Sequence, residues 1–272
     1  MIRGPLEADG RMAAKNATKI RAALKQSADF QRLFEQYAET HPTPSKNRTM
    51  DRAKARAWVI VNAQINEEAL ATILERIWAE AYVLGDAAAA EWIERARQAQ
   101  KAPQVLIDWS KWKPGDKATA LLLRRPRGFR LLLQQAGIII RDMKRTTLDD
   151  IGTALADSIE LGLDAVRASR LIAQHVASPS RALTIAITEQ NRAMTAASVE
   201  RYKEAEIGQV EWEVSDPCPK CAQNANVVVT IGQSFPSGNT QPPAHPHCRC
   251  VLLPLIPGSD EYNARNGVFE EV

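Results

Sequence analysis

The stretch Cys218–Cys250, CPKCAQNANVVVTIGQSFPSGNTQPPAHPHCRC, contains all 4 cysteines of the 272-residue chain and two of its 4 histidines. It is rich in Pro, Gly and Asn, so it buries too little apolar surface to offset its chain entropy, and it needs a cross-link to fold. The C-x-x-C spacing of Cys218 and Cys221 lets one tight turn direct two sulfurs at a single metal ion. We therefore expect a small, loop-rich segment that a metal ion stabilises.

The second half of the stretch offers more candidate ligands than the remaining tetrahedral positions, namely His245, His247, Cys248 and Cys250. If this half is extended, Cys248 and Cys250 point to the same side, which favours a site of four thiolates. If it forms a tight turn, His245 and Cys248 converge, which favours three thiolates and one imidazole. The sequence leaves both arrangements open. Arg249, between two potential thiolates, either offsets their charge or is solvated.

The start of the chain indicates the redox environment. MIRGPLEADGRMAAKN has no apolar run long enough for a signal peptide, and no run of roughly 18 apolar residues predicts a membrane span. We expect synthesis in a reducing cytoplasm, where clustered cysteines are more often metal thiolates than disulfides. Two disulfides, or four unrelated free thiols, are the alternatives. The predicted metal is Zn²⁺, with ligands drawn from Cys218, Cys221, His245, Cys248 and Cys250.

The sequence favours a structural over a catalytic role for this zinc. Pro217–Cys221 matches the P-C-x-x-C half of the zinc deaminase signature, whose other half is H-x-E. Neither His41 nor His175 has a glutamate two positions later, and no H-E-x-x-H, G-x-S-x-G or Walker A motif is present. Without a paired general base, abundant sulfur ligands indicate a closed structural site, so we expect no enzymatic activity.

The rest of the chain predicts a mainly helical body. Apolar residues at 45% and charged residues at 25% are ordinary globular values, and a net charge of +3 is too mild to predict nucleic-acid binding by itself. Helical patterns cover Met12–Ala38 in one or two helices, residues 51–100 with Gly85 ending or kinking the helix, and residues 116–135 with a break or kink at Pro126. Thr146 or Thr147 is expected to cap the next helix, and Ser178 and Ser180 open the last one. The segment from His41 to Thr49 is expected to be a connector, with Thr49 as the N-cap of the helix that follows it.

Composition changes at Gly208, where VEWEV and later CRCVLLPLI predict two strands. The predicted fold class is therefore mainly α, a helical body with a small C-terminal α+β, zinc-knuckle-like cap. We divide the chain into a helical N-terminal region, residues 1–145, and a second region, residues 146–272. The second region comprises helices over 146–207, a zinc-clamped cap over 208–257 and a short tail over 258–272.

A basic region is the second candidate site. It comprises Arg124, Arg125, Arg127 and Arg130, followed by Arg141, Lys144 and Arg145. These side chains can neutralise phosphates or contact an acidic protein surface, although such a run is more often a solvated helix face. Trp109 and Trp112 can stack on bases or anchor a partner, but burial against the helices is the simpler expectation. His175 is expected at a core or boundary position.

An ordered series of motifs resembles the Mu F-like minor head, or head morphogenesis, proteins of tailed phages. The series is Thr188-Glu189, Asn191, Trp212, Asp216, Cys218-x-x-Cys221 and His245-Pro246-x-Cys248-Arg249-Cys250. It spans about residues 150–255 and is far more specific than a lone C-x-x-C. The stretch FPSGNTQPPAHPHCRCVLLP is similar to members from phages of actinobacteria.

The resemblance implies a non-enzymatic minor capsid protein, present in few copies at the portal vertex or in the head interior of the virion. It would assist head assembly, DNA packaging or DNA ejection. Its implied location is the host cytoplasm during assembly and the virion afterwards. The implied partners are the portal protein and the major capsid protein, with packaged DNA as a further one and no membrane. Some members carry a C-terminal toxin domain, but only Val251–Val272 follow the last cysteine, so we expect none here.

Two hypotheses from other classes remain open at this point. One is a cytoplasmic zinc-ribbon protein that binds nucleic acid through residues 124–145, with a steep salt dependence. The other is a zinc hydrolase, and this hypothesis is weak because the sequence offers no paired general base.

Overall fold

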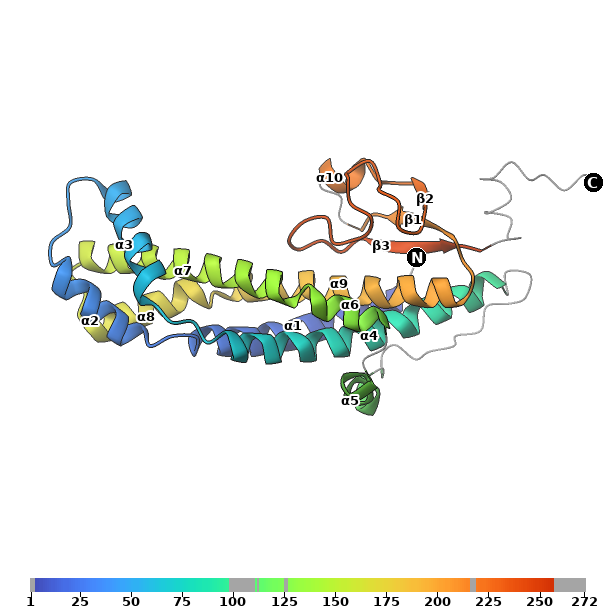
Figure 1. Cartoon of the computed structure of the whole chain (residues 1–272), viewed down its shortest axis with the longest axis horizontal. Helices are drawn as coiled ribbons and strands as arrows, with labels where there is room; N and C mark the ends of the chain where they lie inside the picture. The colour runs from blue at the N-terminus through green and yellow to red at the C-terminus, as the bar shows by residue number, and fades with distance from the viewer. Residues whose placement is uncertain (1–2, 98–110, 112, 125–126, 216–218, 257–272) are drawn as a thin grey trace, which may run out of the picture. The chain divides into compact units, whose positions relative to one another are not determined.

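The structure is a computed structural model that describes residues 3–97, 111, 113–124, 127–215 and 219–256 (Figure 1). Its helices are α1 (Arg3–Lys25), α2 (Phe30–Thr40), α3 (Arg48–Asn62), α4 (Glu67–Arg97), α5 (Gly115–Arg124), α6 (Arg127–Gln134), α7 (Ala136–Glu160), α8 (Ala165–Val176), α9 (Pro179–Glu204) and α10 (Pro219–Ala222). Its strands are β1 (Gln209–Glu213), β2 (Val228–Thr230) and β3 (Val251–Leu255). The predicted fold class, mainly α with a small C-terminal α+β cap, is confirmed.

Contacts between residues divide the chain into two compact units. The first unit consists of Met1–Ala14, Glu75–Leu133 and Thr184–Val272, and the second of Lys15–Leu74 and Gln134–Leu183. Each unit therefore combines segments that are far apart in the sequence. The division into residues 1–145 and 146–272 stays a prediction, and its boundary lies inside α7.

The second unit is built around α7, which packs against α3 and α8, while α2 packs against α8. Side-chain caps begin three of its helices. Asp29, Asn47 and Asp164 each accept a hydrogen bond from the backbone N–H three residues later, at 2.9–3.1 Å. Gly152 brings α7 close to α3, because a Cβ added there would lie 2.6 Å from the Cα of Arg56. Helix contact thus depends on a missing side chain at this position.

Two predicted helix starts in this unit are wrong. Asn47, not Thr49, caps α3, since its side chain accepts from the N–H of Met50. Thr146 and Thr147 lie inside α7, which already begins at Ala136. Their hydroxyls donate to the carbonyl of Met143, three and four residues earlier, which is the bond that a threonine makes within a helix.

The prediction for His175 is also wrong. His175 lies exposed in the last turn of α8 rather than at a core or boundary position.

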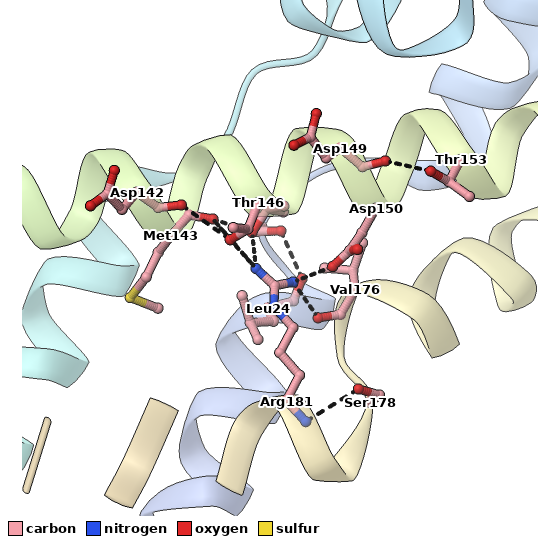
Figure 2. A network of polar contacts seen from close by, with 12 residues as sticks. Leu24, Asp142, Met143, Thr146, Asp149, Asp150, Thr153, Val176, Ser178 and Arg181 are labelled. Carbon is pink, nitrogen blue, oxygen red and sulfur yellow. Dashed lines mark hydrogen bonds and ion pairs between the residues drawn. The ribbon is translucent and has the colours of Figure 1, made fainter. Parts of the chain in front are cut away.

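Arg181, near the start of α9, organises the interior of the second unit (Figure 2). Its guanidinium donates to the carbonyl of Val176 at 2.7 Å and to the hydroxyls of Thr146 and Thr147 at 2.9 Å each. It also forms an ion pair with Asp150 at 3.0 Å. Burial lowers the pKa of Arg181, while Asp150 raises it. One side chain therefore ties the end of α8 and the middle of α7 to the start of α9.

The first unit rests on the packing of α4 against α9. Gly85 does not end α4, which runs on to Arg97. A Cβ at Gly85 would lie 2.3 Å from the carbonyl oxygen of Met194, so this glycine permits the two backbones to meet. Arg201 adds a two-pronged ion pair to Asp86, at 2.8 and 2.9 Å. Ser178 opens α9 as predicted, by accepting from the N–H of Arg181.

The cap, residues 208–256, holds a three-stranded antiparallel sheet of order β2-β1-β3 (Figure 1). The register pairs Val210 with Val229 and with Pro254. Proline, which cannot donate to a sheet, is thus confined to the edge strand β3. The predicted strands correspond to β1 and β3, whereas β2 and the short helix α10 were not predicted.

Several predictions fall on residues outside those described, namely Trp109, Trp112, Arg125, Pro126, Asp216, Cys218 and the tail from residue 258. None of the described helices combines the length and the apolar character that crossing a membrane requires.

Candidate metal centre

The predicted ligands come from two segments of the cap. Cys221 lies in α10, and His245 and Cys248 lie in the loop that leads into β3. One ligand atom from each of these three residues lies within 4.8 Å of the others. Both cysteines are fully buried, and His245 is half-buried. The fold therefore brings residues more than 20 positions apart to one point, as the metal hypothesis requires.

The loop before β3 is a tight turn rather than an extended segment. The N–H of Cys248 donates to the carbonyl of His245 at 3.3 Å, and His247 has a left-handed backbone with φ 64°. Of the two arrangements that the sequence left open, the structure has the one in which His245 and Cys248 converge. His247 is exposed and lies outside this group, and its backbone N–H donates to the hydroxyl of Thr188 at 2.9 Å.

The imidazole of His245 is oriented for a ligand role. Its Nδ1 lies 2.7 Å from the carbonyl of Pro246, which can only accept, so Nδ1 carries the proton. Nε2 is then the free acceptor, and it lies 3.0 Å from the sulfur of Cys221. A ligating histidine in metal proteins is fixed in this way, by a hydrogen bond from its other nitrogen.

Cys250 extends the group of sulfurs. Its thiol has its pKa lowered to about 5, chiefly by a hydrogen bond from Cys248 and further by Trp212 and Cys221. The same contact, together with burial, raises the pKa of Cys248. The hydrogen bond between the two sulfurs therefore favours the thiolate form of Cys250 and the thiol form of Cys248. We call Cys221, His245, Cys248 and Cys250 the Cys/His cluster.

Trp212, at the centre of β1, fits a negatively charged sulfur. Its indole N–H is fully buried and has no conventional hydrogen-bond partner. It nevertheless approaches Cys250 closely enough to lower the pKa of that thiol. The ring is held edge-on against Phe235, with centroids 4.9 Å apart. A buried donor facing a sulfur stabilises a thiolate, the form that binds metals.

Helix α9 braces the loop that carries these ligands. The amide of Asn191 donates to the carbonyls of Cys248 and Cys250, at 2.7 and 3.0 Å, and its own oxygen accepts from Thr195. The hydroxyl of Tyr202, about three helical turns further along, donates to the carbonyl of Leu252 at the start of β3. The bonds from Asn191 satisfy buried backbone oxygens of the loop, and the bond from Tyr202 holds the strand that follows it. Helix α9 thus fixes the path of the loop.

The Thr188–Asn191 motif gains a physical meaning from these contacts. Thr188 accepts from His247, and Asn191 holds the two cysteine carbonyls. Glu189 is buried and accepts from the indole of Trp78 at 3.1 Å, and burial raises the pKa of its carboxyl. Gln190 donates to Asp9 at 2.8 Å. Four consecutive side chains of α9 therefore contact three segments of the first unit, namely the loop before β3, α4 and α1.

Arg249 forms an ion pair with the buried carboxylate of Asp9, with 3.6 Å between the charged atoms. Burial raises the pKa of Asp9, while Arg249 and the hydrogen bond from Gln190 lower it. The sequence left open whether Arg249 is solvated or offsets the charge of the thiolates, and the structure shows a third role, the ion pair with Asp9. It connects the cysteine loop to the first helix.

A second amide, Asn224, joins the two halves of the cap. It is fully buried three residues after Cys221. Its side chain donates to the hydroxyl of Ser237 at 2.8 Å and accepts from the N–H of Ser237 at 2.9 Å. Sequence reasoning assigned no role to Asn224, Tyr202 or Asp9. Asn and Asp are usually exposed and Tyr is intermediate, so the sequence did not indicate a structural role, and only the structure shows that they are buried.

The residues present fit a zinc ion. Two sulfurs bound to a tetrahedral zinc at about 2.3 Å lie roughly 3.8 Å apart, which is within the spread of the cluster. The donors are thiols and an imidazole whose free nitrogen faces them, and no carboxylate of the described residues belongs to the group. Cys218 lies outside the described residues. The cluster can therefore hold a metal ion such as zinc, and its donor set suits a structural site.

The residues of the predicted basic region are divided between the two units. Arg127 and Arg130 are exposed on α6. Within the second unit, Lys144 pairs with Glu67, and Arg145 pairs with Asp142. Nothing is described of the side chain of Arg124. Arg141 and Arg145, in the second unit, are exposed as well.

Comparison with known proteins places the cluster in a family. Residues 149–253 match the family model described as Phage Mu protein F like protein. No curated protein and no solved structure matches the chain. The matched range ends inside β3 and includes α8, α9, β1 and the Cys/His cluster, in agreement with the motifs from Thr188 to Cys250. The match does not support a narrower relation to phages of actinobacteria. Residues 149–253 of the chain are thus similar to the Phage Mu protein F-like family.

Proposed function

We propose that the chain is a minor capsid or head morphogenesis protein of a tailed phage, and that it acts without an enzymatic step. The match of residues 149–253 carries this proposal, because Mu F-like proteins are structural proteins of phage heads. Its finer role is to assist head assembly, DNA packaging or DNA ejection near the portal. The portal protein and the major capsid protein are its proposed partners, with packaged DNA as a further one.

The first test is quantitative mass spectrometry of purified particles of the phage that encodes the chain. We expect a low and reproducible copy number, close to that of the portal protein and far below that of the major capsid protein. Cross-linking in the same particles then identifies the neighbouring protein. Absence from finished particles would overturn the virion assignment and would point to a transient assembly factor.

We further propose that the cluster binds a structural Zn²⁺ through Cys221, His245 and Cys248, with Cys218 as the fourth ligand. The orientation of His245 and the burial of both cysteines support the first three. The C-x-x-C spacing supports Cys218, and Cys250 then remains beside the site as a thiol that Trp212 faces. When bound, the ion supplies a cross-link between two loops that have little regular structure.

Two histidines of one loop provide a matched test of this site. The variant His245→Ala should lose the metal, measured as zinc per chain by elemental analysis, whereas His247→Ala should retain it because His247 lies outside the group. Equal zinc content in both variants would contradict the assignment. Cys218→Ser and Cys250→Ser, compared in the same assay, decide which of them supplies the fourth ligand.

The nucleic-acid hypothesis, which concerns residues 124–145, can be tested at Arg127 and Arg130, which are exposed. It predicts that duplex DNA binds with an affinity that falls steeply with salt, and that replacing both arginines by glutamine reduces the salt slope by about 2. The minor capsid proposal requires no such binding by the free chain.

A further inference from the structure

Helix α3 leaves one apolar face without a partner among the described residues. Its inner face buries Ala55 and Val59. The opposite face exposes Met50, Ile60 and Val61, with 47, 62 and 82% of each residue accessible. Positions 50, 57 and 61 recur at intervals of seven and four residues, so they lie along one side of the helix. An exposed apolar stripe of this kind is typical of a surface that binds another helix.

A pocket lies beside this stripe. It is lined by the connector between α2 and α3, by Asp51 and Lys54 of α3, and by Ala156 and Ile159 of α7. Its wall is well ordered, because His41 stacks on Tyr37 with ring centroids 4.4 Å apart. The backbone N–H of Ser45 donates to Asp51 at 2.8 Å, and two prolines restrict the connector. A pocket formed in advance binds with little loss of conformational freedom.

Charge gives this surface its preference. The segment from Lys46 to Arg56 carries five basic residues and one acidic residue. Arg48 and Arg52 are paired with acidic groups of α7, and Asp51 accepts from the connector. Lys54 is exposed, and among the described residues it has no hydrogen-bond or ion-pair partner. It lies four residues after Met50 and seven before Val61, on the same side of the helix. The surface thus combines an apolar stripe with one free cation at a pocket.

We propose that this face of α3 binds an amphipathic helix of a partner protein that places an acidic side chain at Lys54. Apolar residues of the partner cover Met50, Ala57, Ile60 and Val61, and its carboxylate enters the mouth of the pocket. Two observations favour a protein helix over nucleic acid. A phosphate backbone would leave Ile60 and Val61 uncovered, and it would meet Asp51 beside the single free lysine.

This binding surface is independent of the metal centre and of the proposed role in phage heads. The face of α3 and the connector, residues 37–61, precede the matched range 149–253, and only Ala156 and Ile159 of the pocket lie inside that range. Helix α3 belongs to the second unit, whereas the cluster belongs to the first. The test needs only the purified chain. Its failure would leave the head assignment untouched, and absence of the chain from phage particles would leave the surface untouched.

The test is a selection from a library of amphipathic helical peptides whose flanking positions are random. Peptides are selected on the full chain and counter-selected on the variant Ile60→Asp, whose position is exposed and tolerates the change. We expect the surviving peptides to be enriched in Asp and Glu beside the apolar stripe. Their affinity should fall by about tenfold or more in Lys54→Glu, because opposite charges become like charges. The matched control Lys46→Glu, also exposed but outside the pocket, should change the affinity by less than about twofold.

Three results would overturn the proposal. The first is a selection that yields no peptide dependent on Ile60. The second is a set of peptides without acidic enrichment, or with equal affinity for Lys54→Glu. The third is either a short DNA duplex whose binding Lys54→Glu abolishes or self-association that Ile60→Asp abolishes, since each assigns the face to another occupant. Unchanged helical circular dichroism and thermal unfolding of each variant establish that it is folded.

Discussion

The interior of the second unit and the cap solve the same problem in different ways. Both must hold together segments from distant parts of the chain. In the second unit, long helices satisfy their own backbone groups, and one partly buried arginine with several acceptors joins α7, α8 and α9. In the cap, the strands have only three to five residues, and the loops form scattered turn hydrogen bonds instead of continuous ladders. There a cluster of sulfurs and an imidazole takes the central place, and α9 supplies the missing hydrogen bonds.

The comparison teaches which regions depend on a group from outside the chain. A helical unit gains most of its stability from packing of apolar faces, which the chain supplies itself. A small loop-rich region does not bury enough surface for this. We therefore expect changes at the cluster to affect the cap alone, and changes at Arg181 to affect the second unit alone.

The largest expected effect is that of Cys221→Ser or of a strong chelator. Structural zinc contributes about 10–16 kcal/mol of apparent binding free energy, which is more than a small region has to spare. The cap should lose protection from hydrogen exchange and become a substrate for proteases, while α3, α7 and α8 remain protected. Unchanged protease resistance of residues 208–256 in the variant would falsify the metal-dependent half of the comparison.

The next effect is that of Arg181→Met, which leaves Asp150 and two threonine hydroxyls without their partner. Removing one member of a buried ion pair costs about 3–5 kcal/mol, and we expect the lower end because Asp150 is partly exposed. Hydrogen exchange should accelerate in α7 and α8, with zinc content unchanged. Arg170→Met, an exposed arginine of α8, is the matched control and should be nearly neutral. Equal effects of the two variants would show that the network adds nothing to stability.

A smaller effect is expected for Asn191→Ala, which removes two bonds to the carbonyls of Cys248 and Cys250. Leaving buried acceptors unsatisfied costs about 1–3 kcal/mol. The loss should appear as faster exchange in the loop before β3 and as weaker zinc retention in competition with a chelator. Gln223→Ala removes an exposed amide of the same cap and should change neither quantity. If zinc retention is the same in both variants, α9 does not brace the site.

The smallest effect is the pH dependence of the stability of the second unit. Burial raises the pKa of the Asp150 carboxyl above 3.8, so protonation in the folded state adds stability as the pH falls through that raised pKa. Hydrogen exchange in α7, corrected for the intrinsic pH dependence of amide exchange, should therefore slow on acidification, and Asp150→Asn should abolish this dependence. Corrected exchange in α7 that accelerates on acidification would contradict the prediction.

The sequence was sufficient to predict the class of the fold and the position of the site, for a physical reason. Helical periodicity and ligand spacing are local properties, so α9, β1 and the group around Cys221 and Cys248 could be read directly. The start of α7 could not, because Thr146 and Thr147 suit a cap and a helix interior equally well. Gly85 was read as a breaker because its neighbour Met194 is remote in sequence. The choice between an extended segment and a turn at His245 also required the structure, since it depends on contacts with Thr188 and Asn191 of α9.

The contact between Gln190 and Asp9 has a consequence for synthesis of the chain. The two residues are 181 positions apart, and Arg249, the ion-pair partner of Asp9, follows later still. At about 5–20 residues per second, a ribosome needs roughly 10–40 s to advance from Asp9 to Gln190. During that interval the first helix emerges without the side chains that receive its buried carboxylate. The first unit therefore completes its contacts at Asp9 only after the segment up to Arg249 has been synthesised.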